Sequence, residues 1–286
     1  MGDLDGKRLL VTGANTGIGK ETVRALAARG ASVLLACRSP ENGRRAMNEI
    51  QAQTGNDNLD VLELDLGDLT SVRSCAEAVL ARDEPLHVLI NNAGLAGHRG
   101  MTRSGFEIQF GTNHVGPFLL TSLLLDRLRA SAPARIVNVA SVAHYDAAGI
   151  DFDAVRTRTR SVTAMREYSV SKLANVLHAQ ELARRINGTG VTTYSLHPGV
   201  IASDIWRRVP WPARTVMKRR MGSPEHGART SVYCATAPEL ADQTGRYYDD
   251  CAPKEPSAAA TTSLAAELWR RSAGWVAEPP SPGSSA

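Results

Sequence analysis

The 286-residue sequence contains no run of about 18 or more apolar residues, which argues against a transmembrane helix. Its first residues lead almost directly into a short apolar segment and lack a signal-peptide core, so we expect no membrane anchor. Only four cysteines are present, with no Cys-x-x-Cys motif and no nearby histidine pair. This spacing argues against a zinc site or a disulfide framework and predicts a metal-free protein of the reducing cytoplasm.

A strong charge bias is also missing. The formal net charge is +4, and the basic residues are scattered apart from short clusters at 207–208 and 218–220. Such clusters are typical of solvated surface, so nucleic acid is not an expected partner. No internal repeat or linker is found before the end of the chain, which is rich in proline and serine. We therefore predict one domain over residues 1–277 and a disordered tail over 278–286.

The first 37 residues have the pattern of a β-α-β unit. Apolar segments at 8–12 and 32–37 predict two buried parallel strands, and residues 20–29 predict the helix between them. A glycine-rich turn joins the first strand to the helix, where backbone N–H groups and the positive helix end can approach a pyrophosphate. A glycine-rich loop alone can be a simple tight turn, but its place here favours dinucleotide binding. The predicted contacts are Gly13, Asn15, Thr16, Gly17, Ile18 and Gly19.

The rest of the chain continues this alternation. Further strands are predicted at 60–66, 86–90, 135–141, 191–196 and 245–248, with helices at 69–80, 106–128 and 168–185. The pattern indicates an α/β fold with a Rossmann-type, doubly wound parallel sheet of about seven strands and helices on both faces. In such a sheet, ligands bind beyond the carboxyl ends of the strands, where Ser141 is expected to lie.

A tyrosine and a lysine are spaced for proton transfer on the last of these helices. Tyr168 and Lys172 are four residues apart, so they share one helical face. A nearby ammonium favours the phenolate, and we therefore expect Lys172 to lower the pKa of Tyr168 toward the neutral range. Ser141 would donate a hydrogen bond to a substrate oxygen as charge develops there.

These motifs, in this order, resemble the short-chain dehydrogenase/reductase family. The carrying features are Thr-Gly-x-x-x-Gly-x-Gly at 12–19, Asn-Asn-Ala-Gly at 91–94, Ser141, and Tyr168-x-x-x-Lys172. The resemblance implies an alcohol–carbonyl oxidoreductase in which Tyr168 transfers the proton. It further implies that Lys172 binds the nicotinamide ribose and that Asn113 bends its helix and supports a water-linked proton relay. The implied cofactor contacts also include Asp65, Leu66, Asn92, Ala93, Gly94, Tyr168, Lys172, Pro198, Gly199, Val200 and Ser203.

The end of the second strand indicates which nicotinamide cofactor is used. An acidic residue there would bind the ribose 2′-hydroxyl of NAD and repel a 2′-phosphate. The sequence has Arg38 instead, and an arginine can bind a 2′-phosphate through two hydrogen bonds. We therefore expect NADP(H) rather than NAD(H), although Arg38 could also be a plain surface arginine.

The 26 residues between Ser141 and Tyr168 are about twice the commonest family spacing. This insertion, expected as a surface excursion over 151–166, is most similar to the retinol dehydrogenase-like branch. A mobile substrate lid is predicted at about 204–221, with Trp206 and Trp211 either packing on substrate or anchoring the loop. Few polar groups are expected around the pocket, which favours a bulky apolar carbonyl substrate.

Three further expectations follow from the resemblance. The helices at 106–128 and 168–185 pair subunits in many relatives, so a homodimer or homotetramer is expected. His98, His144 and Tyr145 lie near the expected pocket and could contact substrate, although loop residues of this kind are more often structural. Two other functions stay open: a non-redox enzyme that uses Tyr168 as a base, and a non-catalytic regulator that senses NADP(H).

Overall fold

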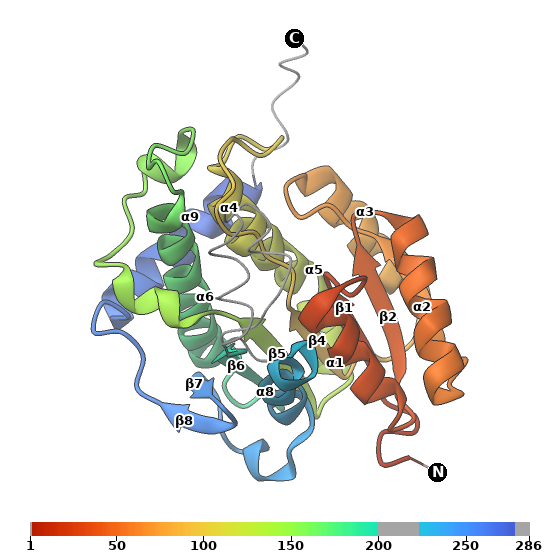
Figure 1. Cartoon of the computed structure of the whole chain (residues 1–286). Helices are drawn as coiled ribbons and strands as arrows, with labels where there is room; N and C mark the ends of the chain where they lie inside the picture. The colour runs from red at the N-terminus through yellow and green to blue at the C-terminus, as the bar shows by residue number, and fades with distance from the viewer. Residues whose placement is uncertain (1, 200–222, 278–286) are drawn as a thin grey trace.

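The computed structural model describes residues 2–199 and 223–277. Val200, Ser203, the expected lid at 204–221 and the expected tail at 278–286 therefore lie outside the described residues. The described strands form one eight-stranded sheet in the order β3-β2-β1-β4-β5-β6-β7-β8 (Figure 1). Its members are β1 (Arg8–Thr12), β2 (Ser32–Cys37), β3 (Leu59–Glu63), β4 (Val88–Asn91), β5 (Ala134–Val139), β6 (Val191–His197), β7 (Arg246–Asp249) and β8 (Ala252–Lys254).

All neighbouring strands pair in parallel except β7 and β8, which are antiparallel. The Rossmann-type prediction is confirmed, with one edge strand more than the seven expected. The seven predicted strands all form, with ends that differ from the predicted ones by up to three residues. The largest difference is at β3, which ends at Glu63, so Asp65 and Leu66 lie in the following loop.

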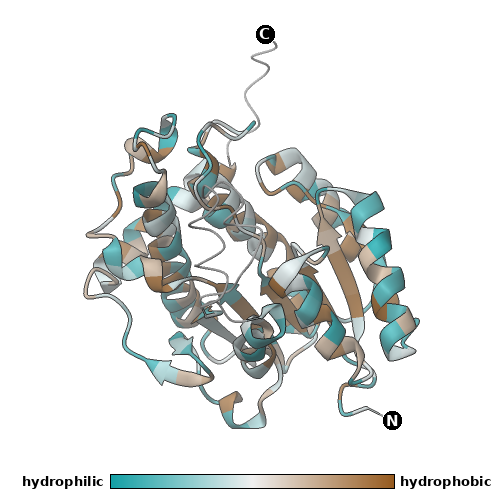
Figure 2. Ribbon diagram, in the orientation of Figure 1, coloured by the Kyte–Doolittle hydropathy of each residue, from teal (hydrophilic) through white to brown (hydrophobic). Residues whose placement is uncertain are grey.

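Helices cover both faces of the sheet. The longer ones are α1 (Gly17–Ala27), α2 (Pro40–Thr54), α3 (Leu69–Leu80), α5 (Gly116–Ala130), α6 (Met165–Arg185), α8 (Pro224–Thr236) and α9 (Thr262–Ala277). Two buried clusters separate the faces: one joins the sheet to α1, α2 and α8, and the other joins it to α3, α5, α6 and α9. Alternate strand residues enter opposite clusters, as Leu9 and Leu10 do, because successive side chains point to opposite faces. Figure 2 shows the resulting apolar strands between amphipathic helices.

Short elements shape the edge of the sheet at which β5 ends. The expected helix at 106–128 is divided into α4 (Ile108–Phe110), a π-helical turn η1 (Gly111–Val115) and α5. This break contains Asn113, the residue that was expected to bend the helix. Two 3₁₀ turns follow β5, namely η2 (Val142–Asp146) and η3 (Ala154–Arg156), and a third, η5 (Pro238–Leu240), precedes β7.

The insertion at 151–166 is tied down more firmly than a surface excursion. The buried Glu107 carboxylate accepts hydrogen bonds from the backbone N–H groups of Gln109 and Phe110 at 2.8 and 2.9 Å, and from the buried Thr159 hydroxyl. The Gln109 amide also donates to the carbonyl of Ala164 at 2.6 Å. These contacts attach the insertion to α4 and place its end directly before Tyr168.

The C-terminal helix α9 covers a face of α5 and α6. The ring of Trp269 packs edge-on against Phe118 at 5.0 Å between centroids, and the guanidinium of Arg185 lies 4.6 Å from the Trp269 ring centroid. Trp275 packs against Phe106 and Phe110 at 5.5 and 6.0 Å. The helices that were expected to pair subunits are therefore covered, on this face, by the chain itself.

Candidate active site

Ser141 and Tyr168 meet beyond the carboxyl end of β5. Ser141 follows this strand by two residues and begins η2, where its Oγ accepts a hydrogen bond from the N–H of Ala143 at 3.2 Å. The Tyr168 phenol approaches it from the first turn of α6, near enough that its interaction with the serine hydroxyl lowers the pKa of the phenol. Both residues are only 9% exposed. The structure thus brings together two hydroxyl groups that can bind one substrate oxygen.

Lys172 lies one helical turn after Tyr168 and is 3% exposed. Its Nζ donates a hydrogen bond to the carbonyl of Val139 at 2.9 Å, and the Nδ2 of Asn175 donates to the same carbonyl at 3.2 Å. Burial lowers the pKa of Lys172 from 10.5 to about 8, because removal from water disfavours the ammonium form. This lysine is therefore held against the last residue of β5.

The pKa of Tyr168 is shifted in the direction opposite to the one expected from the sequence. Burial raises it, and the hydrogen bond with Ser141 only partly opposes that rise. Lys172 has its Nζ 5.7 Å from the Tyr168 ring centroid and turned to the Val139 carbonyl. Desolvation of the phenol therefore outweighs the i,i+4 attraction on which the expectation was based.

Asn113 occupies the π-helical turn and is 1% exposed. Its Oδ1 accepts from the N–H of Leu95 at 2.7 Å, while its Nδ2 donates to the Leu95 carbonyl and to the Ser171 hydroxyl, both at 2.9 Å. A methyl group added at Gly94 would lie 3.3 Å from both Asn113 Oδ1 and Lys172 Nζ. A side chain at position 94 would thus crowd both polar atoms, and glycine leaves this space open.

The loops after β1 and β4 are joined through Thr12. Its Oγ1 accepts from the N–H groups of Asn92 and Ala93, each at 3.0 Å, and its carbonyl accepts from the Asn92 side chain at 2.8 Å. A Cβ at Gly13 would lie 2.8 Å from the Cα of Ala93, and one at Gly19 would lie 2.5 Å from Nδ2 of Asn92. Only glycine permits this close approach of the two loops.

Comparison with known proteins agrees with this arrangement. Residues 7–152 match the model of the short chain dehydrogenase family. Human retinol dehydrogenase 13 is 44% identical over 94% of this chain and 84% of its own length. The chain belongs to the short-chain dehydrogenase family.

Solved structures show the same fold. A crystal structure of an uncharacterized protein from Mycobacterium paratuberculosis matches with a TM-score of 0.78 and 32% identity, covering 98% of this chain and 97% of that one. The Pseudomonas aeruginosa RhlG/NADP active-site complex matches with a TM-score of 0.71 and 25% identity, over 90% of this chain and 98% of that one. The predicted family and its retinol dehydrogenase-like branch are thus confirmed.

Members of this family use a nicotinamide cofactor, and the glycine-rich turn of this dehydrogenase has the shape to hold one. Gly13 and Gly17 have φ values of +66° and +54°, a region that favours glycine. No described atom lies within 4 Å of a Cβ placed at Gly17, so the turn is open where a pyrophosphate would approach. Asn15 and Thr16 lie in this turn, and Ile18 lies in the first turn of α1, which begins at Gly17 rather than at residue 20 as predicted.

Arg38 lies directly after β2 and is exposed. It makes no hydrogen bond or ion pair with any residue in the described ranges 2–199 and 223–277. The Asp65 carboxylate accepts from the N–H of Gly67 at 2.9 Å, leaving its other oxygen available. Leu66 is 4% exposed and packs into the core, so an adenine ring could touch only a small part of it. Pro198 and Gly199 follow β6 and are partly exposed.

The other residues expected near the pocket have structural partners. His98 contacts the carbonyl of Ala96 through its Nδ1 at 2.9 Å, and the Tyr145 hydroxyl donates to the carbonyl of Glu255 at 2.5 Å. His144 is fully buried.

Thr12, Asn175 and His197 were missed by the sequence analysis, because their importance depends on contacts between distant strands and loops. Their only local signal is a position at or near the end of a strand or on the Tyr168 helix.

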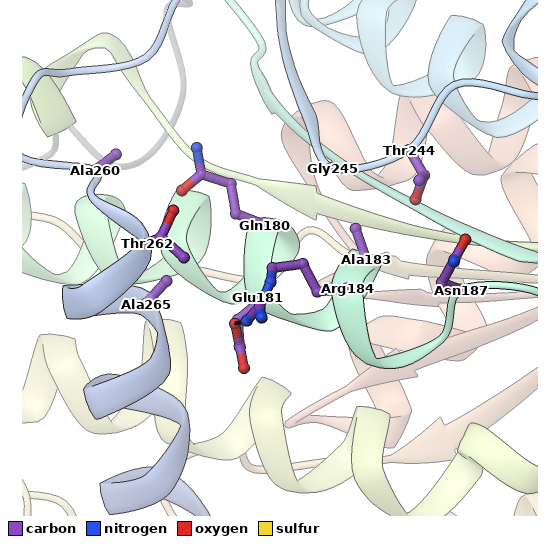
Figure 3. A pocket seen from close by; sticks show the side chains of 10 residues that line it. All are labelled: Gln180, Glu181, Ala183, Arg184, Asn187, Thr244, Gly245, Ala260, Thr262 and Ala265. Carbon is purple, nitrogen blue, oxygen red and sulfur yellow. Dashed lines mark hydrogen bonds and ion pairs between the residues drawn. The ribbon is translucent and has the colours of Figure 1, made fainter.

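A cavity of about 590 Å³ lies elsewhere, between the second half of α6, the loop before β7 and the start of α9 (Figure 3). Gln180, Arg184 and Thr262 are among its lining residues. Gln180 is 12 residues along α6 from Tyr168, or about 18 Å. This cavity is therefore separate from the catalytic groups.

Within residues 2–199 and 223–277, no cluster of potential metal ligands is found, and no helix is long and apolar enough to cross a membrane.

Proposed function

We propose that this dehydrogenase interconverts an alcohol and a carbonyl compound with NADP(H), using Ser141, Tyr168, Lys172 and Asn113. The carrying observation is the meeting of the Ser141 and Tyr168 hydroxyls beside β5, with Lys172 held against the same strand end. This arrangement supplies two hydroxyls for one substrate oxygen and a cation one helical turn away. The retinol dehydrogenase relatives support the same class of reaction.

In the direction of reduction, Ser141 and Tyr168 both donate hydrogen bonds to the carbonyl oxygen of the substrate. Negative charge grows on this oxygen as the carbon gains a hydride, which the nicotinamide supplies when it is bound. Tyr168 then transfers its proton to the oxygen and completes the alcohol. The positive charge of Lys172 stabilises the phenolate that remains. Asn113 and Lys172, whose polar atoms both border the space beside Gly94, support return of a proton to Tyr168.

Arg38 and the open glycine turn favour NADP(H). An exposed arginine without a described partner, directly after β2, is suited to a 2′-phosphate, with which its guanidinium can form two charge-assisted hydrogen bonds. The Pseudomonas aeruginosa RhlG structure is an active-site complex with NADP, which supports the same choice. The four free cysteines, three of them buried, are consistent with a reducing compartment, and we propose a cytoplasmic location.

The proposed substrate is a bulky apolar aldehyde or ketone. Val142, directly after Ser141, is 37% exposed and offers apolar surface beside the hydroxyl pair. The names of the retinol dehydrogenase relatives point to the same chemical class, for which all-trans-retinal is a suitable probe and nonanal a smaller one.

The test combines cofactor titration with turnover. We expect NADPH oxidation with all-trans-retinal or nonanal, and a loss of kcat of about 100-fold or more in Tyr168→Phe and Ser141→Ala. Arg38→Ala should raise the Kd of NADPH by about 10- to 100-fold and leave the Kd of NADH unchanged. Arg129 is an exposed arginine at the end of α5, at the opposite edge of the sheet. Arg129→Ala therefore controls for the loss of one positive charge.

Three results would count against the proposal. Equal or tighter binding of NADH than of NADPH would contradict the role of Arg38. Conversion of a substrate without oxidation of bound NADPH would show a non-redox enzyme. Failure to bind either nucleotide would remove the cofactor assignment altogether.

A further inference from the structure

His144 lies three residues after Ser141 and is 0% exposed. Both nitrogens of its ring have a backbone partner: Nδ1 lies 2.7 Å from the carbonyl oxygen of Ser141, and Nε2 lies 3.1 Å from the backbone nitrogen of Ser257. A carbonyl can only accept a hydrogen bond, and a backbone N–H can only donate one. The Nδ1 must therefore carry the hydrogen and Nε2 must be bare, which makes His144 a neutral imidazole in one tautomer.

Aromatic neighbours fix the plane of this imidazole. The ring of Tyr247 on β7 lies 4.7 Å from it and the ring of Tyr145 lies 4.0 Å from it, measured between centroids. Burial also lowers the pKa of His144, in agreement with the neutral form that its two partners require. The imidazole is thus held in place by packing as well as by hydrogen bonds.

The two partners of His144 are far apart in the sequence. Ser257 lies between β8 and α9, and its Oγ accepts a hydrogen bond from the N–H of Ala259 at 3.2 Å. The imidazole therefore links the segment that leads into α9 to the backbone of the proposed catalytic serine. No other described side chain donates a hydrogen bond to the Ser141 carbonyl.

The strand end around Ser141 depends on such side-chain contacts. Beyond β5 the backbone leaves the sheet, and its polar groups need other partners. The N–H of Val142 donates to Nδ1 of His197 at 3.3 Å, and Lys172 binds the carbonyl of Val139. His144 completes this set at Ser141 itself, through the carbonyl. The serine hydroxyl itself remains free to interact with Tyr168.

We propose that His144 is a positioning residue for Ser141, and that it couples the position of the serine hydroxyl to the docking of the segment before α9. This inference rests on the proposed function of Ser141. His144 does not touch substrate, since its nitrogens are both used and its side chain is buried. Its effect is on the geometry of the hydroxyl pair, where a displacement of about 1 Å is enough to slow catalysis by roughly 100-fold.

The two contacts can be separated by substitution. The amide nitrogen of asparagine can replace Nδ1, so His144→Asn keeps a donor for the Ser141 carbonyl and loses the acceptor for Ser257. Glutamine reaches further and can replace Nε2, so His144→Gln keeps the acceptor for Ser257 and loses the side-chain donor for Ser141. The Ser141 carbonyl then keeps only the backbone N–H of residue 144, at 3.1 Å. Tyr145→Phe is the matched control for kcat and KM, because it removes the neighbouring hydrogen bond from η2 to Glu255 without touching Ser141. It is not used in the exchange comparison, since Glu255 belongs to the segment that is measured.

The experiment measures kcat and KM for nonanal reduction, the Kd of NADPH, and hydrogen–deuterium exchange of the 255–261 segment. We expect His144→Gln to lower kcat by about 10- to 100-fold with little change in KM or Kd. His144→Asn should retain more of the kcat but speed exchange of the Ser257 amide. In a Ser141→Ala background, His144→Gln should lower kcat no further, because the group that it positions is gone.

The inference fails if His144→Gln lowers kcat as strongly in the Ser141→Ala background as in the wild type, or if it leaves the wild-type kcat intact. If His144→Gln does not fold, His144→Asn decides: unchanged exchange at Ser257 would contradict the coupling. A wild-type protein that binds NADPH but reduces neither nonanal nor all-trans-retinal would instead contradict the proposed function. In that case, unchanged exchange in His144→Asn would still refute the proposed coupling.

Discussion

Replacing Lys172 by methionine should stabilise this protein at neutral pH while abolishing its proposed activity. Lys172 is 3% exposed, and burial lowers its pKa from 10.5 to about 8. That difference corresponds to about 3 kcal/mol by which folding disfavours the charged form. Methionine has a similar length and no charge. It removes this penalty and one hydrogen bond to the Val139 carbonyl, which is worth about 1 kcal/mol and still has Asn175 as a donor. The net gain at pH 7 should be about 2 kcal/mol.

The gain must disappear as the pH rises. Between pH 8 and pH 10.5 the unfolded wild type binds more protons at this lysine than the folded one, so wild-type stability rises with pH relative to the variant. Above about pH 10.5 the penalty is gone, and Lys172→Met should be the less stable protein by about 1 kcal/mol. Urea denaturation of both proteins at pH 7, 9 and 10.5 measures this difference, and pH effects of other groups cancel in it.

Lys20 forms an ion pair with Glu49 near the protein surface. Lys20→Met therefore controls for the loss of one positive charge. It should show no stability gain at pH 7. The reasoning about burial is refuted if Lys172→Met destabilises the protein at pH 7, or if the difference from wild type is the same at pH 7 and pH 10.5.

Three other predictions concern the relay, the reaction direction and the assembly. Gly94→Ala should fold but lower kcat, because its methyl group would lie 3.3 Å from Asn113 Oδ1 and Lys172 Nζ; normal kcat would exclude a relay through this space. Because burial raises the pKa of Tyr168, the phenol stays protonated at neutral pH, so initial rates of alcohol oxidation should rise between pH 7 and 9.5; a fall would contradict this. Light scattering during size-exclusion chromatography should give a monomer, since α9 covers the α5–α6 face; a dimer would require a different interface.

The sequence was sufficient for seven of the eight strands of the described sheet and for the family. An apolar run such as 32–37 predicts a buried strand without knowledge of the strands beside it. The four-residue spacing of Tyr168 and Lys172 likewise predicts, from the sequence alone, that they share a helical face. The helices α2, α8 and α9 and the strand β8 were not predicted, and for β8 and α9 the reason is physical. β8 has three exposed residues and includes a proline, and the buried positions of α9, such as Leu268, face α6 rather than the sheet. Neither element can be recognised without the partner that it packs against.

The sequence predicted which residues of the site lie close together, but not the direction in which the pKa of Tyr168 is shifted. The four-residue spacing correctly places Lys172 beside Tyr168, yet it says nothing of how much water each group loses. Both are almost completely buried, so desolvation raises the tyrosine pKa and lowers the lysine pKa. His144 shows the same limit, because its neutral tautomer follows from Ser257, a partner 113 positions away. At neutral pH such a site holds a protonated phenol at Tyr168 and an ammonium at Lys172 whose charge is little screened by water, and this charge is available when negative charge develops on the substrate oxygen. Burial at the end of β5 therefore has two effects with one physical origin, the exclusion of water. It lowers the stability of the protein at Lys172, and it produces the reactivity expected at Tyr168.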